Sequence, residues 1–329
     1  MQAIVYSEYG PASEVLHLRE VEKPTADEGE VLVKVHATSV NYSNTAFVSG
    51  KPFIVRLMGA GMRRPDFEIL GTDIAGEVEA VGKHVRQFQP GDRVFGDLSD
   101  CGRGGYAQFV AVPESALAIM PNNLSYSEAA AVPESALVAL QGLRDMGEIK
   151  SGQDVLISGA SGGIGSFAVQ IAKYYGARVT AVCSTRNVEM VSEIGADHVI
   201  DYTKEDFAQK EPGYDLILAT VGHRSIFDYK RALKPHGRYV CTGGSMTQIF
   251  QAMLLGNLLT LSDDRKMGSL LVKINQEDLN FIRELIESGA IHPLIDRQYP
   301  LGEAAEAIEY YATGRTRGKV VITIDDDVD

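Results

Sequence analysis

The stretch DVLISGASGGIGSFAVQIAKYY, residues 154–175, decides the fold of this chain. It opens with the apolar run Val155 to Ile157, which is typical of a parallel strand covered on both faces. A turn with four glycines follows, and an apolar pattern at helical spacing completes the stretch. Because glycine has no Cβ, the N–H groups that open such a helix can meet a pyrophosphate. The stretch therefore predicts a dinucleotide-binding site.

This prediction has two alternatives. An ordinary strand-turn-helix would show the same pattern, since glycine turns are common. The spacing Gly159-x-x-x-Gly163-x-Gly165 also fits the turn of short-chain dehydrogenases. That family carries its turn near the N-terminus, whereas residues 1–153 precede the strand here. Its Tyr-x-x-x-Lys pair occurs nowhere in the sequence, so we do not assign the chain to it.

Length and charge limit the class of protein. A chain of 329 residues can form two domains, each with its own core. The net charge of −13 argues against nucleic acid or an anionic membrane as a partner. No apolar run approaches the roughly 20 residues that a spanning helix needs. Met1 leads directly into a strand pattern, so we expect no signal peptide and predict a cytoplasmic protein.

Cysteine and histidine usage predicts no metal site. The three cysteines lie far apart in the sequence, which suits a reduced cytosolic protein and cannot build a four-cysteine zinc lobe. The seven histidines form no H-x-H or H-x-x-x-H pair.

The order of patterns along the chain predicts the domains. Residues 1–122 read as a β-rich module, because short apolar or alternating runs are separated by turn residues. Beyond the glycine turn, strands alternate with helices over 123–272, which predicts an α/β doubly wound parallel sheet, a Rossmann domain. Residues 273–329 close the chain with two helices and a final strand. The acidic end DDDVD, 325–329, is expected to be solvated, and we assign it no function.

The whole arrangement resembles the medium-chain dehydrogenase/reductase superfamily. The segments that carry the resemblance extend over nearly the whole chain. They are VLVKVHATSVNYSN, LGTDIAGEVEAVGKHVRQFQPGDRVFG, GGYAQFVAVPE, AAAVPESALVALQGL, the glycine turn, GADHVIDY and GRTRGKVVITI. The resemblance implies a GroES-like first domain, a C-terminal segment that returns to it, and an active site between the domains.

Within that superfamily, the sequence looks like the zinc-free, quinone-oxidoreductase-like branch. Where zinc alcohol dehydrogenases carry ligands, this chain has Asn41, Thr72 and Glu134. A catalytic zinc needs three N, S or O ligands that bind well, and amide and hydroxyl groups are poor ones. The resemblance therefore implies a site without zinc.

Three residues are candidates for catalysis. The resemblance implies that the side chain of Asn41 faces the nicotinamide and the substrate, although Asn41 could instead be a turn residue. Ser43 aligns with a hydroxyl that relays a proton in alcohol dehydrogenases. Glu134 could be an acid catalyst or a carboxylate favoured at a helix N-terminus. The family's active-site tyrosine is not at its expected place, where Ala46 and Phe47 stand.

The cofactor is predicted to be NADPH. An acidic residue about 20 residues past the turn would hold the ribose of NAD, but this chain has Ser184, Thr185 and Arg186 there. A guanidinium can bind a 2′-phosphate through charge-assisted bonds, although Arg186 could be a solvated surface residue. The resemblance adds Tyr202 to this phosphate site. The remaining candidate cofactor contacts come from the turn and two later strand ends: Ser161, Gly162, Gly163, Ile164, Val221, Gly243 and Gly244.

These features predict an NADPH-dependent, zinc-free oxidoreductase that transfers hydride to a quinone or an α,β-unsaturated carbonyl compound. Apolar residues between Tyr42 and Asp66 suggest a small hydrophobic substrate. An NAD(P)-dependent alcohol dehydrogenase and a nucleotide-binding protein without turnover are the alternatives. Residues 268–274, GSLLVKI, look like the last Rossmann strand, which pairs with a second copy in this superfamily, so we expect a homodimer.

Overall fold

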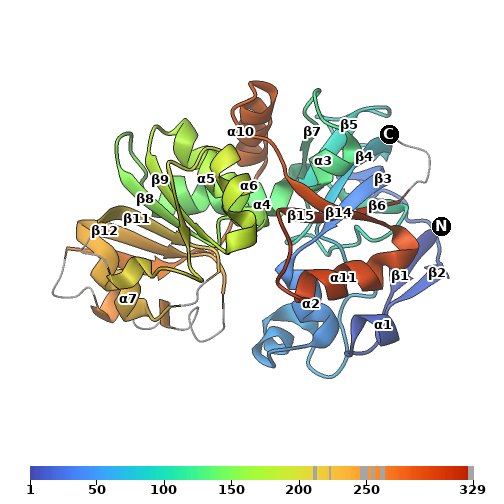
Figure 1. The fold of residues 1–329 in the computed structure, drawn as a ribbon. Helices are drawn as coiled ribbons and strands as arrows, with labels where there is room; N and C mark the ends of the chain where they lie inside the picture. Colours follow the sequence, from blue (N-terminus) through green and yellow to red (C-terminus); the bar gives the residue numbers. More distant parts are fainter. Residues whose placement is uncertain (210–212, 222–223, 245–250, 253–255, 260–263, 325–329) are drawn as a thin grey trace. The chain divides into compact units, whose positions relative to one another are not determined.

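The computed structural model describes residues 1–209, 213–221, 224–244, 251–252, 256–259 and 264–324 (Figure 1). The chain divides into two compact units. The first unit comprises Met1–Glu134, Ile274–Ser288 and Pro293–Asp329, and the second comprises Ser135–Lys273 and Gly289–His292. The first division falls at Glu134 where the sequence suggested 122, because the helix after residue 125 packs on strands of the first unit. The acidic end 325–329 lies outside the described residues.

The first unit is built on a mostly antiparallel sheet in the order β14-β15-β3-β4-β5-β7, with β6 also paired to β3. A separate hairpin joins β1 to β2. The strands of the first unit are β1 (Gln2–Val5), β2 (His17–Glu20), β3 (Glu30–Val40), β4 (Asp73–Val81), β5 (Arg93–Asp97), β6 (Phe109–Pro113), β7 (Leu117–Ile119), β14 (Ile295–Pro300) and β15 (Lys319–Thr323). Its helices are α1 (Ala12–Val15), α2 (Tyr42–Ser49), α3 (Tyr126–Ala130), α10 (Gln276–Glu287) and α11 (Ala304–Ala312), while α4 (Pro133–Gln141) begins in it and ends in the second unit.

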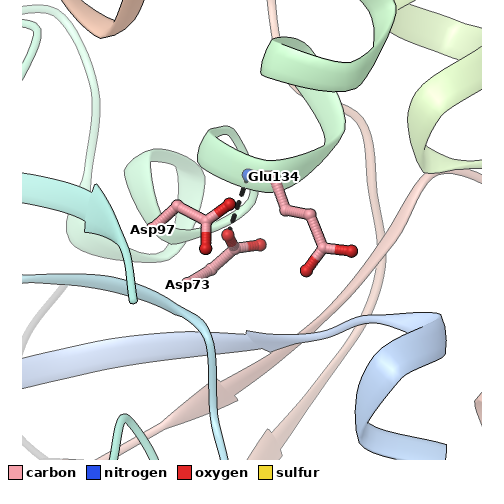
Figure 2. Close-up of side chains that lie close together, drawn as sticks. All are labelled: Asp73, Asp97 and Glu134. Atoms are coloured by element: carbon pink, nitrogen blue, oxygen red, sulfur yellow. Dashed lines mark hydrogen bonds between the residues drawn. The ribbon is translucent and has the colours of Figure 1, made fainter. Parts of the chain in front are cut away.

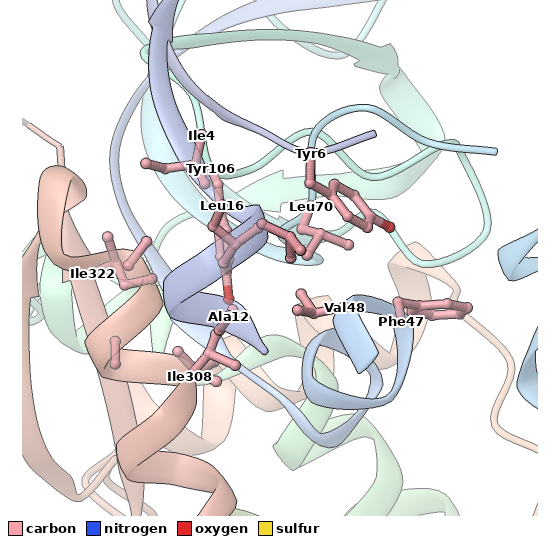
Figure 3. Packing of buried hydrophobic residues seen from close by; sticks show 14 of the residues in the cluster. Ile4, Tyr6, Ala12, Leu16, Phe47, Val48, Leu70, Tyr106, Ile308 and Ile322 are labelled. Atoms are coloured by element: carbon pink, nitrogen blue, oxygen red, sulfur yellow. The ribbon is translucent and has the colours of Figure 1, made fainter. Parts of the chain in front are cut away.

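The C-terminal segment is part of the first unit because its last strand completes the sheet. β15 pairs antiparallel with β3, with Val320 opposite Val40. Helix α11 packs against α1 and α2. Figure 3 shows the apolar core that results, in which Ile308 and Ile322 from this segment meet Ala12 and Val48 from the start of the chain.

Strand register brings particular side chains to one end of this sheet. β4 and β5 are antiparallel, and Asp73 at the start of β4 lies directly opposite Asp97 at the end of β5. Since Val320 is opposite Val40, the residues next to them, Lys319 and Asn41, are also neighbours. The ends of four strands therefore meet at one place.

The second unit is a six-stranded parallel sheet in the order β10-β9-β8-β11-β12-β13, as the sequence predicted for its fold class (Figure 1). In chain order this is the 3-2-1-4-5-6 arrangement of dinucleotide-binding domains, in which ligands bind where the order reverses. The strands are β8 (Asp154–Ser158), β9 (Arg178–Cys183), β10 (His198–Asp201), β11 (Tyr214–Ala219), β12 (Leu233–Cys241) and β13 (Lys266–Ser269). The helices are α5 (Gly163–Tyr174), α6 (Val188–Glu193), α7 (Ile226–Ala232) and α9 (Gly256–Leu259).

The last strand differs from the prediction. We expected it over residues 268–274, but β13 covers Lys266–Ser269, and residues 270–274 are not in a strand. β13 pairs only as far as Cys241 of β12, where β12 itself ends. A parallel strand needs a neighbour to hold its hydrogen bonds, so the apolar pattern that continues to Ile274 was not sufficient to extend it.

Candidate functional site

The glycine turn lies between β8 and α5 and has the geometry of a phosphate cradle. Gly159 has φ +84°, a conformation that side-chain-bearing residues rarely adopt. A Cβ on Gly165 would lie 2.1 Å from the carbonyl oxygen of Gly159, so this position needs glycine for the close packing of helix on strand. A Cβ on Gly162 would lie 3.7 Å from its nearest neighbour, so the space beside the helix N-terminus is open. The turn therefore fits a pyrophosphate held by the N–H groups of α5.

A buried asparagine that the sequence reading missed connects two of the predicted cofactor residues. The side-chain amide of Asn187 donates to Ser161 Oγ at 2.9 Å and to Ser184 Oγ at 3.3 Å. Asn187 is 3% exposed, and its Oδ1 has no hydrogen-bond partner among the described residues. Asn187 therefore holds the hydroxyls of the glycine turn and of the end of β9 next to each other.

The predicted 2′-phosphate site lies at the ends of β9 and β10. Arg186 is exposed, and Tyr202 is 48% exposed, with its N–H bonded to the carbonyl of Cys183 at the end of β9. The structure adds Asp201, which register places opposite Cys183. Asp201 was not foreseen, because it belongs to the next strand along the chain.

The carboxylate of Asp201 is already occupied by neighbouring donors. It accepts hydrogen bonds from the hydroxyls of Thr185 at 2.6 Å and Thr203 at 2.7 Å, and it forms an ion pair with Lys204 at 3.1 Å. These donors, Thr185 first, lower the pKa of Asp201 below its ordinary value. Asp201 is 7% exposed, so it presents little free negative charge to a ligand at this end of the sheet.

The other predicted cofactor residues lie at the ends of β11 and β12. Val221 follows β11 and is 41% exposed, and Gly243 follows β12. A Cβ on Gly243 would lie 2.5 Å from the carbonyl oxygen of Thr220, and Gly244 has φ +120°. Ile164 is half-buried in the first turn of α5. The predicted cofactor residues thus lie just after β9, β10, β11 and β12 or in the turn that follows β8, the edge where such sheets bind nucleotides.

The first unit carries a separate, buried polar network around Asn41. The ammonium of Lys319 donates to Asn41 Oδ1 and to Asp73 Oδ2, the latter at 3.1 Å. The amide nitrogen of Asn41 donates to Thr72 Oγ1 at 3.0 Å and to Asp73 Oδ2 at 2.9 Å. Ser39 also donates to Asp73 Oδ2, at 2.7 Å. Asn41 is 4% exposed and Lys319 is 2% exposed, so this network is shielded from water.

The carboxamide of Asn41 is engaged on both its oxygen and its nitrogen inside this network. The resemblance implied that its carboxamide faces the nicotinamide, yet both its oxygen and its nitrogen are engaged by Lys319, Thr72 and Asp73. The sequence reading could not find this, because Lys319 follows Asn41 by 278 residues. Ser43 differs: its Oγ is buried and has no hydrogen-bond partner among the described residues.

Three carboxyl groups converge beside the network. One oxygen each from Asp73, Asp97 and Glu134 lies within 4.8 Å of the others, and Figure 2 shows the three side chains close together. The N–H of Glu134, at the start of α4, donates to Asp73 Oδ1 at 2.8 Å. Two unit charges 4.8 Å apart repel each other by about 3.5 kcal/mol at an effective dielectric constant of about 20. Lys319 forms an ion pair with Asp73, and Arg103 lies within electrostatic range of Glu134 and Asp97. The mutual repulsion of the three carboxylates still favours a proton on at least one of them.

The pKa values of this cluster follow from burial and from like charge. Burial, then the charges of Glu134 and Asp73, raise the pKa of Asp97 well above its ordinary value. Burial, then Asp73, raise the pKa of Glu134 to about 7, although Lys319 and the Thr72 hydroxyl act in the opposite direction. Burial and like charge therefore favour the protonated form of Asp97, and a pKa of about 7 lets Glu134 exchange its proton near neutral pH.

The fold and these sites define a class of protein: a dinucleotide-binding enzyme with a separate sheet domain that holds an acid-base cluster. Comparison with known proteins agrees with this class. Residues 27–122 match the family described as alcohol dehydrogenase GroES-like domain, and residues 194–322 match the family described as zinc-binding dehydrogenase.

Individual relatives are similar over nearly the whole chain. A chloroplastic quinone oxidoreductase of Triphysaria versicolor is 34% identical over 98% of each chain. An NADPH-dependent alkenal/one oxidoreductase of Arabidopsis thaliana is 30% identical over 98% of this chain and 79% of its own. The structure of the quinone oxidoreductase from Coxiella burnetii is 29% identical, with a TM-score of 0.88 over 99% of both chains.

The chain belongs to the medium-chain dehydrogenase/reductase superfamily, in its quinone-oxidoreductase-like branch. The resemblance read from the sequence is confirmed, as is the fold class of a GroES-like domain with a Rossmann domain. The protein is an oxidoreductase that uses a nicotinamide cofactor. None of the helices described is long and apolar enough to span a membrane.

Proposed function

We propose that this protein is an NADPH-dependent, zinc-free reductase that transfers hydride to a quinone or to the double bond of an enone or enal. The names of the two relatives above, a quinone oxidoreductase and an alkenal/one oxidoreductase, support both substrate classes. The observation that carries the proposal is the Lys319 network, which joins Asn41 and Thr72, two of the residues that the sequence resemblance aligns with the metal ligands of zinc dehydrogenases.

The donor chemistry at two of the three aligned ligand positions, Asn41 and Thr72, does not fit zinc. Tetrahedral zinc sites take thiolate, imidazole or carboxylate ligands, and Asn41 and Thr72 offer an amide and a hydroxyl that already bond each other. The buried ammonium of Lys319 would also repel a divalent cation at this place. Elemental analysis of protein purified without added metal should find less than one zinc per chain, and one zinc per chain would contradict the proposal.

NADPH is the cofactor that the second unit fits better. Arg186 and Tyr202 flank the end of β9, and the carboxylate of Asp201 at this end of the sheet is engaged by Thr185, Thr203 and Lys204. A free carboxylate there would repel a 2′-phosphate, whereas an engaged one repels it less.

The cofactor would supply the hydride, and the residues of the chain would do the rest. The glycine turn would hold the pyrophosphate, and Ser161 and Ser184 would present hydroxyls fixed by Asn187. Asn41 is a positioning residue that keeps Lys319 and Asp73 in register, and Ser43 offers a hydroxyl without an internal partner among the described residues.

A screen of NADPH oxidation tests this function. Quinones, enones and enals are each assayed with NADPH, whose oxidation is followed. Primary alcohols are assayed with NADP⁺, whose reduction is followed, at the same pH and temperature. We expect turnover with members of the first three classes and none with the alcohols. Alcohol oxidation in preference to quinone and enone reduction would overturn the proposal.

We also propose a homodimer and a cytoplasmic location. Among the described residues, β13 pairs only with β12, and Leu271 just beyond it is 85% exposed, which suits an edge covered by a second copy. Light scattering should give a dimer mass that Leu271→Arg lowers toward the monomer, and a monomeric wild type at micromolar concentration would refute the dimer. The three cysteines are free, which supports a reducing compartment, and cell fractionation tests the location.

A further inference from the structure

Hydride transfer alone does not complete the reduction, and none of the roles proposed above supplies the proton that it also needs. Reduction of a carbon-carbon double bond or of a quinone also consumes a proton, which a positioned side chain commonly provides. Asp73, Asp97 and Glu134 bring three carboxyl groups together in the first unit, and Lys319 forms an ion pair with one of them, Asp73.

We propose that Glu134 is the proton donor of the reaction, with Asp97 as a neutral acid behind it and the Lys319–Asp73 ion pair as a fixed charge beside it. This inference rests on the proposed reductase function and adds the source of the proton.

Exposure separates Glu134 from the other two carboxyl groups. Asp73 and Asp97 are 0% exposed, whereas Glu134 is only half-buried. Glu134 stands at the start of α4, and the hydroxyl of Thr72 donates to its Oε2 at 3.0 Å. Its backbone N–H is fixed to Asp73. Glu134 is thus held by the cluster on one side and can exchange a proton with a ligand or water on the other.

Asp97 provides an independent observation for a proton inside the cluster. Its Oδ1 accepts hydrogen bonds from the N–H of Ser99 at 2.9 Å and from its hydroxyl at 2.6 Å. Its Oδ2 is buried and has no hydrogen-bond partner among the described residues. A carboxylate oxygen left without a donor beside Asp73 is unfavourable, whereas the same oxygen as an O–H group carries no charge. The geometry therefore assigns the proton of Asp97 to Oδ2.

The electrostatic surroundings set the pH at which Glu134 can act. Asp73 favours its protonated form, while Lys319, the Thr72 hydroxyl and Arg103 favour the carboxylate. Burial of the carboxyl and these opposing charges place its pKa at about 7. Tyr106 and Tyr311 also lie within the electrostatic range of Glu134, and both remain neutral phenols because burial raises their pKa values. A group that must be protonated acts below its pKa, so turnover should fall as pH rises through about 7.

The step balances without a further reactant. After the substrate has accepted the hydride, the O–H bond of Glu134 breaks and its proton forms a C–H bond with an enolate carbon or an O–H bond with a quinone oxygen. Glu134 is left as a carboxylate beside Asp73, and their repulsion favours recovery of a proton from water.

The test uses Glu134→Gln, which keeps the shape of the side chain but has no acidic proton, with Asp100→Asn as a control because Asp100 is exposed. We expect Glu134→Gln to lower kcat by about 10²-fold or more and to remove the decline above pH 7, with NADPH affinity unchanged. The control should behave as wild type. Lys319→Met should move the decline to higher pH, and Lys319→Arg should leave it in place.

Infrared spectroscopy of the protein alone gives a readout independent of turnover. Wild type should show carbonyl bands of two protonated carboxylic acids near neutral pH, one that titrates at about 7 and is missing in Glu134→Gln, and one that persists and is missing in Asp97→Asn. Absence of both bands would overturn the proposal, as would wild-type kcat and pH profile in Glu134→Gln. If wild type reduces no quinone or enone, the proposed function fails, and the infrared bands still decide the protonation of the cluster.

Discussion

Replacing Lys319 by methionine should strongly destabilise the first unit. Methionine keeps much of the volume of the side chain but removes its charge and its donors. The ammonium of Lys319 is 2% exposed and bonds both Asn41 and Asp73, so its loss leaves the Asp73 carboxylate buried without its ion-pair partner. Removing one partner of a buried ion pair costs about 3–5 kcal/mol.

A second substitution tests whether the buried charge of Asp73 causes the loss of folding free energy in Lys319→Met. In Lys319→Met/Asp73→Asn, the buried charge is removed together with its partner, and the asparagine introduced in place of Asp73 is a neutral group of the same shape. Because replacing both members of a buried pair is often nearly neutral, we expect the double variant to recover at least half of the lost stability. Lys319→Arg, which keeps the charge, should lose less than Lys319→Met.

Urea denaturation followed by circular dichroism measures these free energies of unfolding. The control is Lys266→Met, because Lys266 is exposed on β13 and lies in the second unit. A loss below about 1 kcal/mol for Lys319→Met, the range of an exposed salt bridge, would refute the reasoning. So would a double variant that is less stable than Lys319→Met alone.

Three further predictions concern the second unit. Arg186→Ala should weaken NADPH binding about tenfold or more and change NADH binding little, because a charge-assisted contact is worth about 1.5–3 kcal/mol. Gly162→Ala should leave the stability of the cofactor-free protein unchanged but weaken cofactor binding, whereas Gly165→Ala should lower the stability itself, because its Cβ would meet the carbonyl of Gly159 at 2.1 Å. The hydrogen bond from Arg178, then the bonds from Lys234, lower the pKa of Asp154 to about 2 from 3.8, so its stabilising effect is present above pH 4 and is lost as pH falls toward 2.

Each of these has a direct measurement. Calorimetric titration with NADPH and NADH tests Arg186→Ala, and equal losses for both cofactors would contradict the assignment of a 2′-phosphate site. Thermal unfolding without cofactor separates the two glycine variants, and equal melting temperatures would refute the argument from Cβ contacts. Urea midpoints at pH 7 and pH 3 test Asp154→Asn, which should be less sensitive to acid than wild type.

Local sequence was sufficient for the features that neighbouring residues create. The glycine turn could be read because the strand, the turn and the helix N-terminus that form it lie within 154–175. The parallel sheet followed from repeated strand-helix alternation, since short crossovers leave few other arrangements. The branch of the superfamily could be read from the residue types at two of the three ligand positions, because the amide of Asn41 and the hydroxyl of Thr72 are poor zinc ligands wherever the backbone places them.

Tertiary structure alone decided which charges meet. Asp73 faces Asp97 because of the register of β4 with β5, and Lys319 reaches Asn41 because β15 closes the sheet against β3. Neither contact leaves a periodic signal in the sequence, since strand register is set by the whole hydrophobic face and not by the polar residues at its ends. The protonation of Glu134 depends in turn on those contacts and on burial, so the sequence identified it as a candidate and only the folded chain determines the pH range in which it can give up a proton.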